Sequence, residues 1–400
     1  MTELVTLPEI EAAARLLDGV IRPTPTVMSD SLSNRLDRPV WLKHEQQQRT
    51  GSFKFRGAYN MLSDLPAGTH VVAASAGNHA QGVALAARLL GMKATIFMPV
   101  TVSLPKLEAT ESYGAEIELV GSLVDECLTS AAVFAQQEGA VLVPPFDDRR
   151  ILAGAGTIGL EVMEAVVDLE CILTPIGGGG LCSGVSAAVK LSRPEVTTVG
   201  VMAEGASSMQ RSIDVGEPVT VVPRTMADGI AIGAPAALTL NHILTYVDRT
   251  VSVGDGAIAT AVLLAAERTK SILEPAGAAS LAAALEGLAP GDGAVAVVLS
   301  GGNMDPLLLG RILEYGLTAS GRFLRLWISL GDLPGALSDL TRTVADMGVN
   351  IVSVEHHRRG THLPVGQVEV ELTLETRNES HQREIIGHLQ EAGFEVGHED

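Results

Sequence analysis

Aromatic and basic residues are scarce in this chain of 400 residues. Phenylalanine, tryptophan and tyrosine make up 3% of it, and 28 lysines and arginines stand against 47 aspartates and glutamates, a formal net charge of −19. Proteins that bind single-stranded nucleic acids use aromatic rings and a basic groove, and an acidic surface repels phosphate backbones. We therefore expect no nucleic-acid partner.

Cysteines and long apolar runs are scarce as well. Cys127, Cys171 and Cys182 are too few and too irregularly spaced for a disulfide framework or a cysteine-based zinc site, so we expect reduced thiols and no metal. No stretch reaches the roughly 18 apolar residues that a membrane span needs. The first residues are acidic where a secretory signal would be basic. We expect a cytoplasmic protein with no membrane partner.

Apolar segments of two kinds alternate along most of the chain. Hydrophobic residues make up 46% of it, which excludes a disordered chain. Between residues 70 and 300, short apolar runs alternate with Ala- and Leu-rich helical segments, as in a parallel sheet covered by helices on both faces. The predicted fold class is therefore α/β. We expect strands at 70–75, 94–99, 117–120, 172–176, 198–203 and 295–299, and helices at 82–90, 104–113, 122–137 and 183–191.

The pattern changes near residue 316. Small and polar residues at 316–322 indicate a linker. The chain then continues in the order β-α-β-β-α-β, the split-βαβ arrangement. We expect two domains, residues 1–316 and 322–400, since about eighty residues suffice for a separate module. In the second domain we expect strands at 323–330, 351–357, 365–373 and 394–396, and helices at 336–347 and 380–391.

Three loops that contain glycine, Ser75–Gly82, Gly177–Leu181 and Ser300–Asn303, each follow a predicted strand. Ligands of open α/β sheets bind at the carboxyl ends of the strands, so the loops predict one shared site, although each alone can be a tight turn. Residues 177–180 also precede a predicted helix, where backbone N–H groups bind phosphate. They match neither the dinucleotide motif nor the P-loop, which favours a smaller phosphorylated cofactor.

Lys54 is the candidate nucleophile. It is either a surface lysine whose stem covers two phenylalanines or an amine whose pKa is lowered by apolar neighbours and by Arg56, ready to form a Schiff base. Beside the glycine loops, the second interpretation is at least as well supported as the first. His79 is either a general base or a packed histidine.

Other polar groups are weaker candidates. His356 and His357 are neighbours on a predicted strand and therefore face opposite sides of it, so they cannot both bind one metal ion. Glu204 with Gln210 could hold a cation or form a surface pair, and the surface pair is the simpler interpretation.

The motifs, taken together, resemble those of threonine ammonia-lyases (threonine dehydratases) over residues 20–315. The segment around Lys54 is similar to the lysine segment that binds the cofactor in that family, and the other motifs follow in the family's order. They are KHE at 43–45, Gln48, TGSFKFRGA at 50–58, SAGNHAQG at 75–82, PPFDD at 144–148, GTIGLE at 156–161, GGGGL at 177–181, DGIA at 228–231, EPAGA at 274–278 and SGGN at 300–303. The resemblance implies the tryptophan-synthase-β-like fold of pyridoxal-phosphate enzymes (fold type II), with a small subdomain at about 45–150 inserted in the large one.

The resemblance also implies a role for each matching residue. Lys54 would hold pyridoxal 5′-phosphate as a Schiff base and move the proton at the α-carbon of the substrate. Phe53 would lie against the cofactor ring, Asn78 would bind its hydroxyl and Ser300 its nitrogen. The cofactor phosphate would be bound by Gly177, Gly178, Gly179, Gly180 and Leu181. The substrate carboxylate would be bound by Ser75, Ala76, Gly77, Asn78 and His79.

The implied reaction is β-elimination from L-threonine, which gives 2-oxobutanoate and ammonia, and from L-serine, which gives pyruvate. Ala76 stands where serine racemases of the same fold carry a second acid, which favours elimination, and Ala155 stands where the family has glutamine. The alternatives are a serine racemase, a serine or hydroxyaspartate ammonia-lyase of this fold, or a catalytically silent amino-acid sensor. Lys54 argues against the sensor, which needs no Schiff base.

The C-terminal module resembles ACT regulatory domains, which bind amino acids. The resemblance implies allosteric control by an effector such as isoleucine or valine, and assembly into a homodimer or homotetramer. A role in isoleucine biosynthesis and a catabolic role both stay open. The expected effector residues are Asp332, Leu333, Pro334, Gly335 and Asn350.

Overall fold

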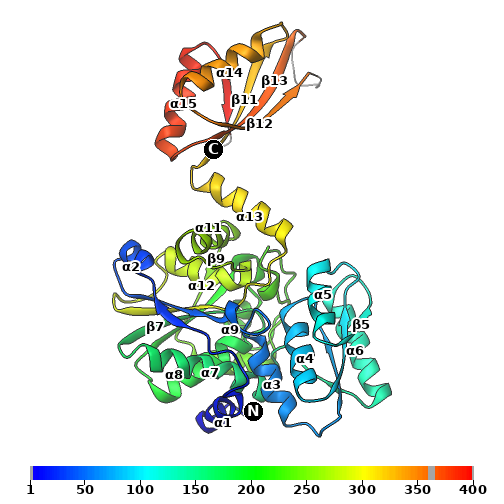
Figure 1. Cartoon of the computed structure of the whole chain (residues 1–400). Coiled ribbons are helices and arrows are strands. Elements are labelled where there is room, and N and C mark those ends of the chain that lie inside the picture. The colour runs from blue at the N-terminus through cyan, green and yellow to red at the C-terminus, as the bar shows by residue number, and fades with distance from the viewer. Residues whose placement is uncertain (1–2, 359–364, 399–400) are drawn as a thin grey trace. The chain divides into compact units, whose positions relative to one another are not determined.

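The computed structural model describes residues 3–358 and 365–398, and the chain divides into two compact units, residues 1–309 and 310–400. Figure 1 shows both units, the first coloured from blue to yellow and the second from yellow to red. The first unit contains two sheets, and the second contains one. Each unit is described by itself.

The larger sheet of the first unit has six strands, and all neighbouring pairs are parallel except β1 with β2. The predicted parallel α/β sheet is thus confirmed, with one antiparallel edge strand. Ile172, Ala296 and Val298 pack with α7 and α8 on one face. In spatial order the strands are β1 (Thr26–Met28), β2 (Val40–His44), β10 (Ala294–Leu299), β7 (Leu169–Pro175), β8 (Thr197–Ala203) and β9 (Arg249–Val253).

The smaller sheet has four parallel strands, β5 (Glu116–Leu119), β4 (Lys93–Met98), β3 (His70–Ala74) and β6 (Val141–Leu142). Val71 and Ala73 pack with α4, whereas Val72 and Ala74 pack with α6. Because neighbouring residues of a strand face opposite sides, helices cover both faces of this sheet. We call these four strands, with α4, α5 and α6, the small lobe.

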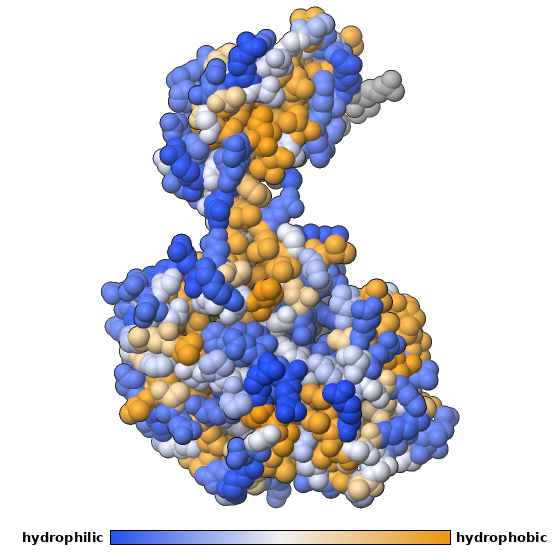
Figure 2. All heavy atoms as spheres, in the orientation of Figure 1, coloured by the Kyte–Doolittle hydropathy of each residue, from blue (hydrophilic) through white to orange (hydrophobic). Residues whose placement is uncertain are grey.

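The helices of the first unit follow the expected order. They are α1 (Leu7–Leu17), α2 (Asp30–Leu36), α3 (Lys54–Ser63), α4 (Asn78–Leu89), α5 (Leu104–Ser112), α6 (Val124–Glu138), α7 (Arg149–Ala165), α8 (Gly180–Ser192), α9 (Ser208–Val215), α10 (Ala237–Tyr246), α11 (Asp255–Leu264) and α12 (Pro275–Leu285). Short helical segments add η1 (Glu45–Gln47), η2 (Glu204–Ala206), η3 (Asp228–Ile230) and the π-helical η4 (Ala265–Thr269). Among the described residues, no helix is both long and apolar enough to cross a membrane, and Figure 2 shows hydrophilic and apolar residues intermixed over the visible face of this unit.

Helix α4 begins at Asn78, four residues earlier than the sequence pattern predicts. Gly82 looks like a helix breaker in the sequence, but here it allows a close approach between two helices. A Cβ at this position would lie 3.1 Å from the backbone carbon of Lys54 in α3. The predicted loop at 75–82 is therefore shorter, and Asn78 and His79 lie in the first helical turn.

Glycines also bring α3, α7 and α8 into contact through their backbones. A Cβ at Gly154 in α7 would lie 2.6 Å from the carbonyl oxygen of Arg56 in α3, and one at Gly184 in α8 would lie 2.2 Å from the carbonyl oxygen of Leu152. Glycine is therefore required at both crossings. The contacts fix α3, which begins at Lys54, relative to α8, which begins at Gly180.

A largely buried ionic cluster lies in the same region. The Arg56 guanidinium contacts Glu45 at 2.8 Å and Glu161 at 2.5 Å, and Lys43 pairs with Glu161. Arg56, Lys43 and Glu45 are fully buried. Removing one member of such a cluster typically costs about 3–5 kcal/mol, because its partner is left as an unpaired buried charge.

The second unit has the predicted β-α-β-β-α-β order and a four-stranded antiparallel sheet. Its core combines one face of the sheet with α14 and α15. Residues 316–319, part of the expected linker, form the last turn of α13 instead. Helix α13 (Pro306–Ala319) begins before the boundary at residue 309 and ends after it, and the elements that follow are β11 (Phe323–Gly331), α14 (Ala336–Asp346), β12 (Ile351–His357), β13 (Gln367–Glu375), α15 (Glu379–Glu391) and β14 (Glu395–His398).

Candidate active site

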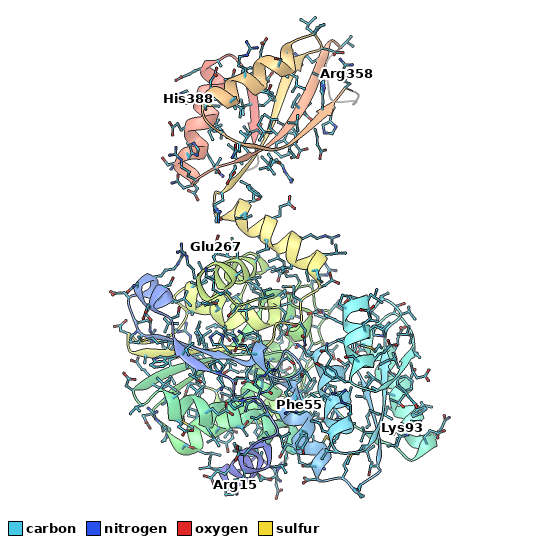
Figure 3. The ribbon with its side chains drawn as sticks, viewed as in Figure 1. Arg15, Phe55, Lys93, Glu267, Arg358 and His388 are labelled. Carbon is cyan, nitrogen blue, oxygen red and sulfur yellow. The ribbon has the colours of Figure 1, made fainter. Side chains whose placement is uncertain are left out.

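Lys54 is the first residue of α3, and its amine is withdrawn from solvent. The amine donates a hydrogen bond to the carbonyl oxygen of Pro145 at 2.9 Å and lies 5.3 Å from the centre of the Phe53 ring. Burial lowers the pKa of Lys54 to about 8, and the carboxylate of Glu274 partly opposes this. A substantial fraction of the amine is therefore neutral near physiological pH, as nucleophilic chemistry requires. Its neighbour Phe55 is labelled in Figure 3.

The loop Gly177–Gly180 connects β7 to α8 and has no room for side chains. A Cβ at Gly177 would lie 2.9 Å from the Cα of Ile230, and one at Gly178 would lie 2.2 Å from the Phe146 ring. Gly179 has a φ of +96°, which favours glycine. Because the first N–H groups of a helix lack intrahelical acceptors, the start of α8 offers its own N–H groups, including that of Leu181, to an anion.

Ser300 follows β10 and lies beside the Lys54 segment. The N–H of Phe53 donates to the carbonyl oxygen of Ser300 at 3.1 Å, and Ser52 forms an isolated bridge with Gly301. The buried hydroxyl of Ser300 lies 3.5 Å from the carbonyl oxygen of Ala276, which is a long hydrogen bond. The structure thus brings Ser300 to the predicted site with its hydroxyl only weakly engaged.

Asn78 is held in one orientation by Glu274 and Asn303, for which the sequence predicts no individual role, although Asn303 ends one of the three predicted site loops. Its amide nitrogen donates to the Glu274 carboxylate at 2.6 Å, and its oxygen accepts from the Asn303 amide at 2.7 Å. Asn303 also donates to the carbonyl oxygen of Thr50 at 2.7 Å. An acidic residue before the helix-starting Pro275 was the available signal for Glu274. Its burial could not be read from the sequence.

Glu274 and Lys54 influence each other's protonation. Burial, with help from Asp228, raises the pKa of Glu274 to about 7, while Asn78, Lys106 and Lys54 act in the opposite direction. The site therefore holds one acid and one base that both titrate near neutral pH. Such perturbed groups cluster at functional sites.

Residues 75–77 connect β3 to α4, and Asn78 and His79 lie in the first turn of α4. The N–H of Gly77 donates to the Ser75 hydroxyl at 3.1 Å, Ala76 is half-buried, and the N–H groups of the first turn of α4 point away from the helix. His79 is buried and its Nε2 lies 2.9 Å from the carbonyl oxygen of Val143. Burial, with the nearby Lys54, lowers the pKa of His79 to about 3, so His79 is a neutral, packed histidine.

The weaker candidates do not join this site. Gln210 bonds to Asp214 and Thr250 rather than to Glu204.

In the second unit, potential ligand atoms of Glu355, His357 and Glu371 lie within 4.8 Å of one another. Arg325 already pairs with Glu371 at 3.2 Å, which makes the group part of an ion-pair cluster on the sheet. His356 and His357 alternate along β12, opposite Val370 and Glu369, so they face opposite sides as predicted.

The expected effector residues lie at two ends of the second unit's sheet. Gly331, beside Asp332, pairs with Gln367 at the start of β13, whereas the carbonyl of Asn350 accepts from Glu375 at its end. These ends are roughly 25 Å apart at about 3.3 Å per residue. The turn at Asp332, Leu333, Pro334 and Gly335 is exposed, and Asp332 pairs with Arg358 at 2.9 Å. Within one chain, the structure does not bring Asn350 to this turn.

Comparison with known proteins gives matches for both units. Residues 17–301 match the family described as pyridoxal-phosphate dependent enzyme, and residues 325–393 match the ACT domain. An L-threonine ammonia-lyase of Thermotoga maritima is 44% identical over 397 residues, which is 98% of this chain and 99% of the relative.

Two solved structures show how the fold compares. The processed form of threonine deaminase isoform 2 from Solanum lycopersicum is similar with a TM-score of 0.73 at 34% identity, covering 78% of this chain and 90% of that one. Maize serine racemase is similar with a TM-score of 0.74 at 31% identity, and the match covers 79% of this chain and 99% of that one. The fold alone therefore does not distinguish elimination from racemisation.

Proposed function

Because the chain belongs to the family of pyridoxal-phosphate dependent enzymes and carries an ACT domain, we propose that it is a threonine ammonia-lyase. It converts L-threonine to 2-oxobutanoate and ammonia, and we expect it to convert L-serine to pyruvate. The observation that carries the proposal is the amine of Lys54, which is withdrawn from solvent and has its pKa lowered to about 8, in a chain similar to a threonine ammonia-lyase over almost its whole length.

The residues present fit pyridoxal phosphate. Gly177, Gly178 and Gly179 leave no room for side chains, as a phosphate-binding loop at a helix N-terminus requires. Buried hydroxyls of Thr50 and Ser52, just before Lys54, have no hydrogen-bond partner among the described residues. Polar capacity for a ligand is therefore available beside the amine.

The cofactor, when bound, supplies the electron sink that makes cleavage at the α-carbon possible. The chain's own residues bind, orient and move protons. The amine of Lys54 would hold the cofactor in the resting enzyme and, when free, would take the proton from the α-carbon of the substrate. The N–H groups at the start of α8 would bind the phosphate, Phe53 would contact the ring, and Asn78 and Ser300 would bind the ring hydroxyl and nitrogen.

Ala76 favours elimination over racemisation. A racemase needs a second proton donor on the opposite face of the α-carbon, and the methyl group of Ala76 donates no proton. His79 does not replace it, because its ring is buried and packed against Val143. A silent sensor is disfavoured by the lowered pKa of Lys54, which serves covalent chemistry and not reversible amino-acid binding.

We further propose that an amino acid, isoleucine or valine, regulates the enzyme through the second unit. Free N–H groups at the start of α14, next to Gly335, suit a carboxylate. A ligand that contacts both this turn and Asn350 has to lie between two chains, because the two positions are far apart in one chain. The proposal therefore includes a homodimer or homotetramer, in which a two-fold axis would bring the turn of one chain to Asn350 of another. A cytoplasmic location and a role in isoleucine biosynthesis complete the proposal.

The deciding experiment measures 2-oxobutanoate from L-threonine with purified protein, with and without isoleucine and valine. Release of 2-oxobutanoate supports the activity, and a response to either amino acid that is lost on removal of residues 320–400 supports the regulation. Racemisation of serine without elimination would contradict the proposed reaction. A full-length enzyme indifferent to both amino acids would contradict the proposed effectors.

A further inference from the structure

Lys106 links two parts of the first unit that lie 122 residues apart in the sequence. It belongs to α5 of the small lobe, and its amine donates to the carboxylate of Asp228 in η3 at 2.5 Å. The side chain of Lys106 is 17% exposed, whereas that of Asp228 is 56% exposed. The lysine is thus held largely inside the protein by a carboxylate that solvent reaches.

The amine of Lys106 also lies beside the loop Ser75–His79. A Cβ at Gly77 would lie 3.8 Å from the Lys106 amine. Gly77 is the N-cap of α4, whose first N–H groups have no intrahelical acceptor. A carboxylate bound to these N–H groups would therefore lie next to an ammonium group. Hydrogen bonds to a charged partner are stronger than neutral ones.

A cation is also favoured beside the loop 75–79, because carboxylates gather there. The carboxylate of Asp228 raises the pKa of Glu274, whereas the ammonium group of Lys106 lowers it. A substrate carboxylate would add a third negative charge to this group. Lys54, the other cation that lowers the pKa of Glu274, is engaged by the proposed reaction itself.

Building on the proposed function, we propose that Lys106 binds the α-carboxylate of the substrate together with the N–H groups of the 75–79 loop. In the free enzyme, Asp228 holds the ammonium group in position. When the substrate binds, its carboxylate competes with Asp228 for Lys106. Lys106 is then a substrate-binding residue, and Asp228 is a positioning residue that acts through it.

Two ligands of the holoenzyme separate carboxylate binding from the rest of the site. L-alanine carries the carboxylate but has no β-hydroxyl to eliminate, and 1-amino-2-propanol corresponds to L-threonine without its carboxylate. Both are titrated while the absorption of the bound cofactor is followed, which gives a Kd without turnover.

For Lys106→Met we expect the Kd of L-alanine to rise about tenfold or more, since a charge-assisted hydrogen bond is lost, and the Kd of 1-amino-2-propanol to stay unchanged. The KM for L-threonine rises more than kcat falls, and Lys106→Arg retains most of the binding. Asp228→Asn lowers the Kd of L-alanine, because the competing carboxylate is gone. The control is Lys93→Met: Lys93 lies in β4 of the same lobe, is labelled in Figure 3, and pairs with Glu116 at 2.9 Å in an exposed position.

Two outcomes would overturn the proposal. If Lys106→Met weakens both ligands equally, the lysine does not recognise the carboxylate. If Asp228→Asn weakens L-alanine as strongly as Lys106→Met does, the ion pair only ties the two parts of the unit together. Should Lys106→Met fail to fold, Lys106→Arg and Asp228→Asn still decide. Failure of the proposed function would be seen separately, as a wild-type enzyme that binds L-alanine but releases no 2-oxobutanoate from L-threonine.

Discussion

The amide of Asn78 donates a hydrogen bond to the carboxylate of Glu274 across 2.6 Å and so ties the first turn of α4 to the N-cap of α12. Asn303 donates to the oxygen of the same amide, which leaves one orientation for the group. An amide nitrogen carries two protons. One is used by Glu274, so the other is available to the cofactor hydroxyl that Asn78 is proposed to bind.

Glu274→Gln tests the raised pKa of this carboxyl group in cofactor-free protein. The pKa of Glu274 is raised from 4.5 to about 7, so the folded state binds the proton more tightly than the unfolded state does. The free energy of unfolding therefore falls as pH rises from about 4.5 to about 7. Glutamine keeps the acceptor for Asn78 but does not ionise. We therefore expect Glu274→Gln to remove this pH-dependent loss and so to raise the free energy of unfolding at pH 8 by up to about 3 kcal/mol relative to the wild type.

The measurement for Glu274→Gln is urea unfolding at pH 5 and pH 8. Glu286→Gln, at the exposed other end of α12, is the control and should keep the wild-type pH dependence. An unfolding free energy of Glu274→Gln that changes with pH as much as the wild type would show that Glu274 is not the group responsible.

Lys54→Ala should abolish covalent cofactor attachment and turnover. The amine at this position is withdrawn from solvent, and its pKa is lowered to about 8. Cofactor absorption and release of 2-oxobutanoate are the two readouts, and Lys93→Ala is the control. Activity within about tenfold of the wild type, a barrier change of only about 1.4 kcal/mol, would refute the assignment.

Ser300→Ala should weaken cofactor affinity while the cofactor still attaches to Lys54. The hydroxyl is only loosely bound to the carbonyl of Ala276 and is therefore available to the ring nitrogen. A neutral hydrogen bond contributes about 0.5–1.5 kcal/mol, or roughly two- to tenfold in affinity. Titration of cofactor-free protein measures this, with the exposed Ser112→Ala as control. Equal affinity of both variants would mean that Ser300 serves another purpose.

Gly184→Ala should destabilise the first unit by about 1–3 kcal/mol or more, because the added methyl group would meet backbone atoms of α7 that cannot move aside. Gly310→Ala in α13 is the matched control, since a Cβ there meets nothing within 4 Å, and helix propensity favours alanine by about 0.5–1 kcal/mol. Unfolding in urea compares the two. A harmless Gly184→Ala would show that α7 and α8 tolerate a wider separation.

The strands and the site loops could be predicted because their signals are local. Short apolar runs such as 198–203 and 295–299 predict buried strands. A row of four glycines after a strand indicates that some group closely approaches the backbone there. The predicted start of α4 was wrong because Gly82 does not break the helix but allows a close contact with α3. The residues around Gly82 in the sequence do not reveal this contact.

Partners from distant segments could not be predicted. The roles proposed here depend on contacts between residues that lie far apart in the sequence. Asn78 contacts Glu274 and Asn303, and Lys106 contacts Asp228. Asn350 shows a related limit. It follows the Asp332–Gly335 turn by 15 residues in the sequence, yet the direction of α14 carries it to the other end of the sheet, so a site that includes both positions needs two chains.

The glycine crossings between α3, α7 and α8 have a consequence for how the enzyme can diversify. Backbone contacts backbone there, so these crossings help to fix the separation between Lys54 and the proposed phosphate-binding loop at residues 177–180. We expect substitutions elsewhere in the core to leave the distance between the Lys54 amine and the loop at residues 177–180 unchanged. We therefore expect changes in the accepted amino acid to arise in the small lobe, around residues 75–79 and Lys106, while the type of reaction stays the same.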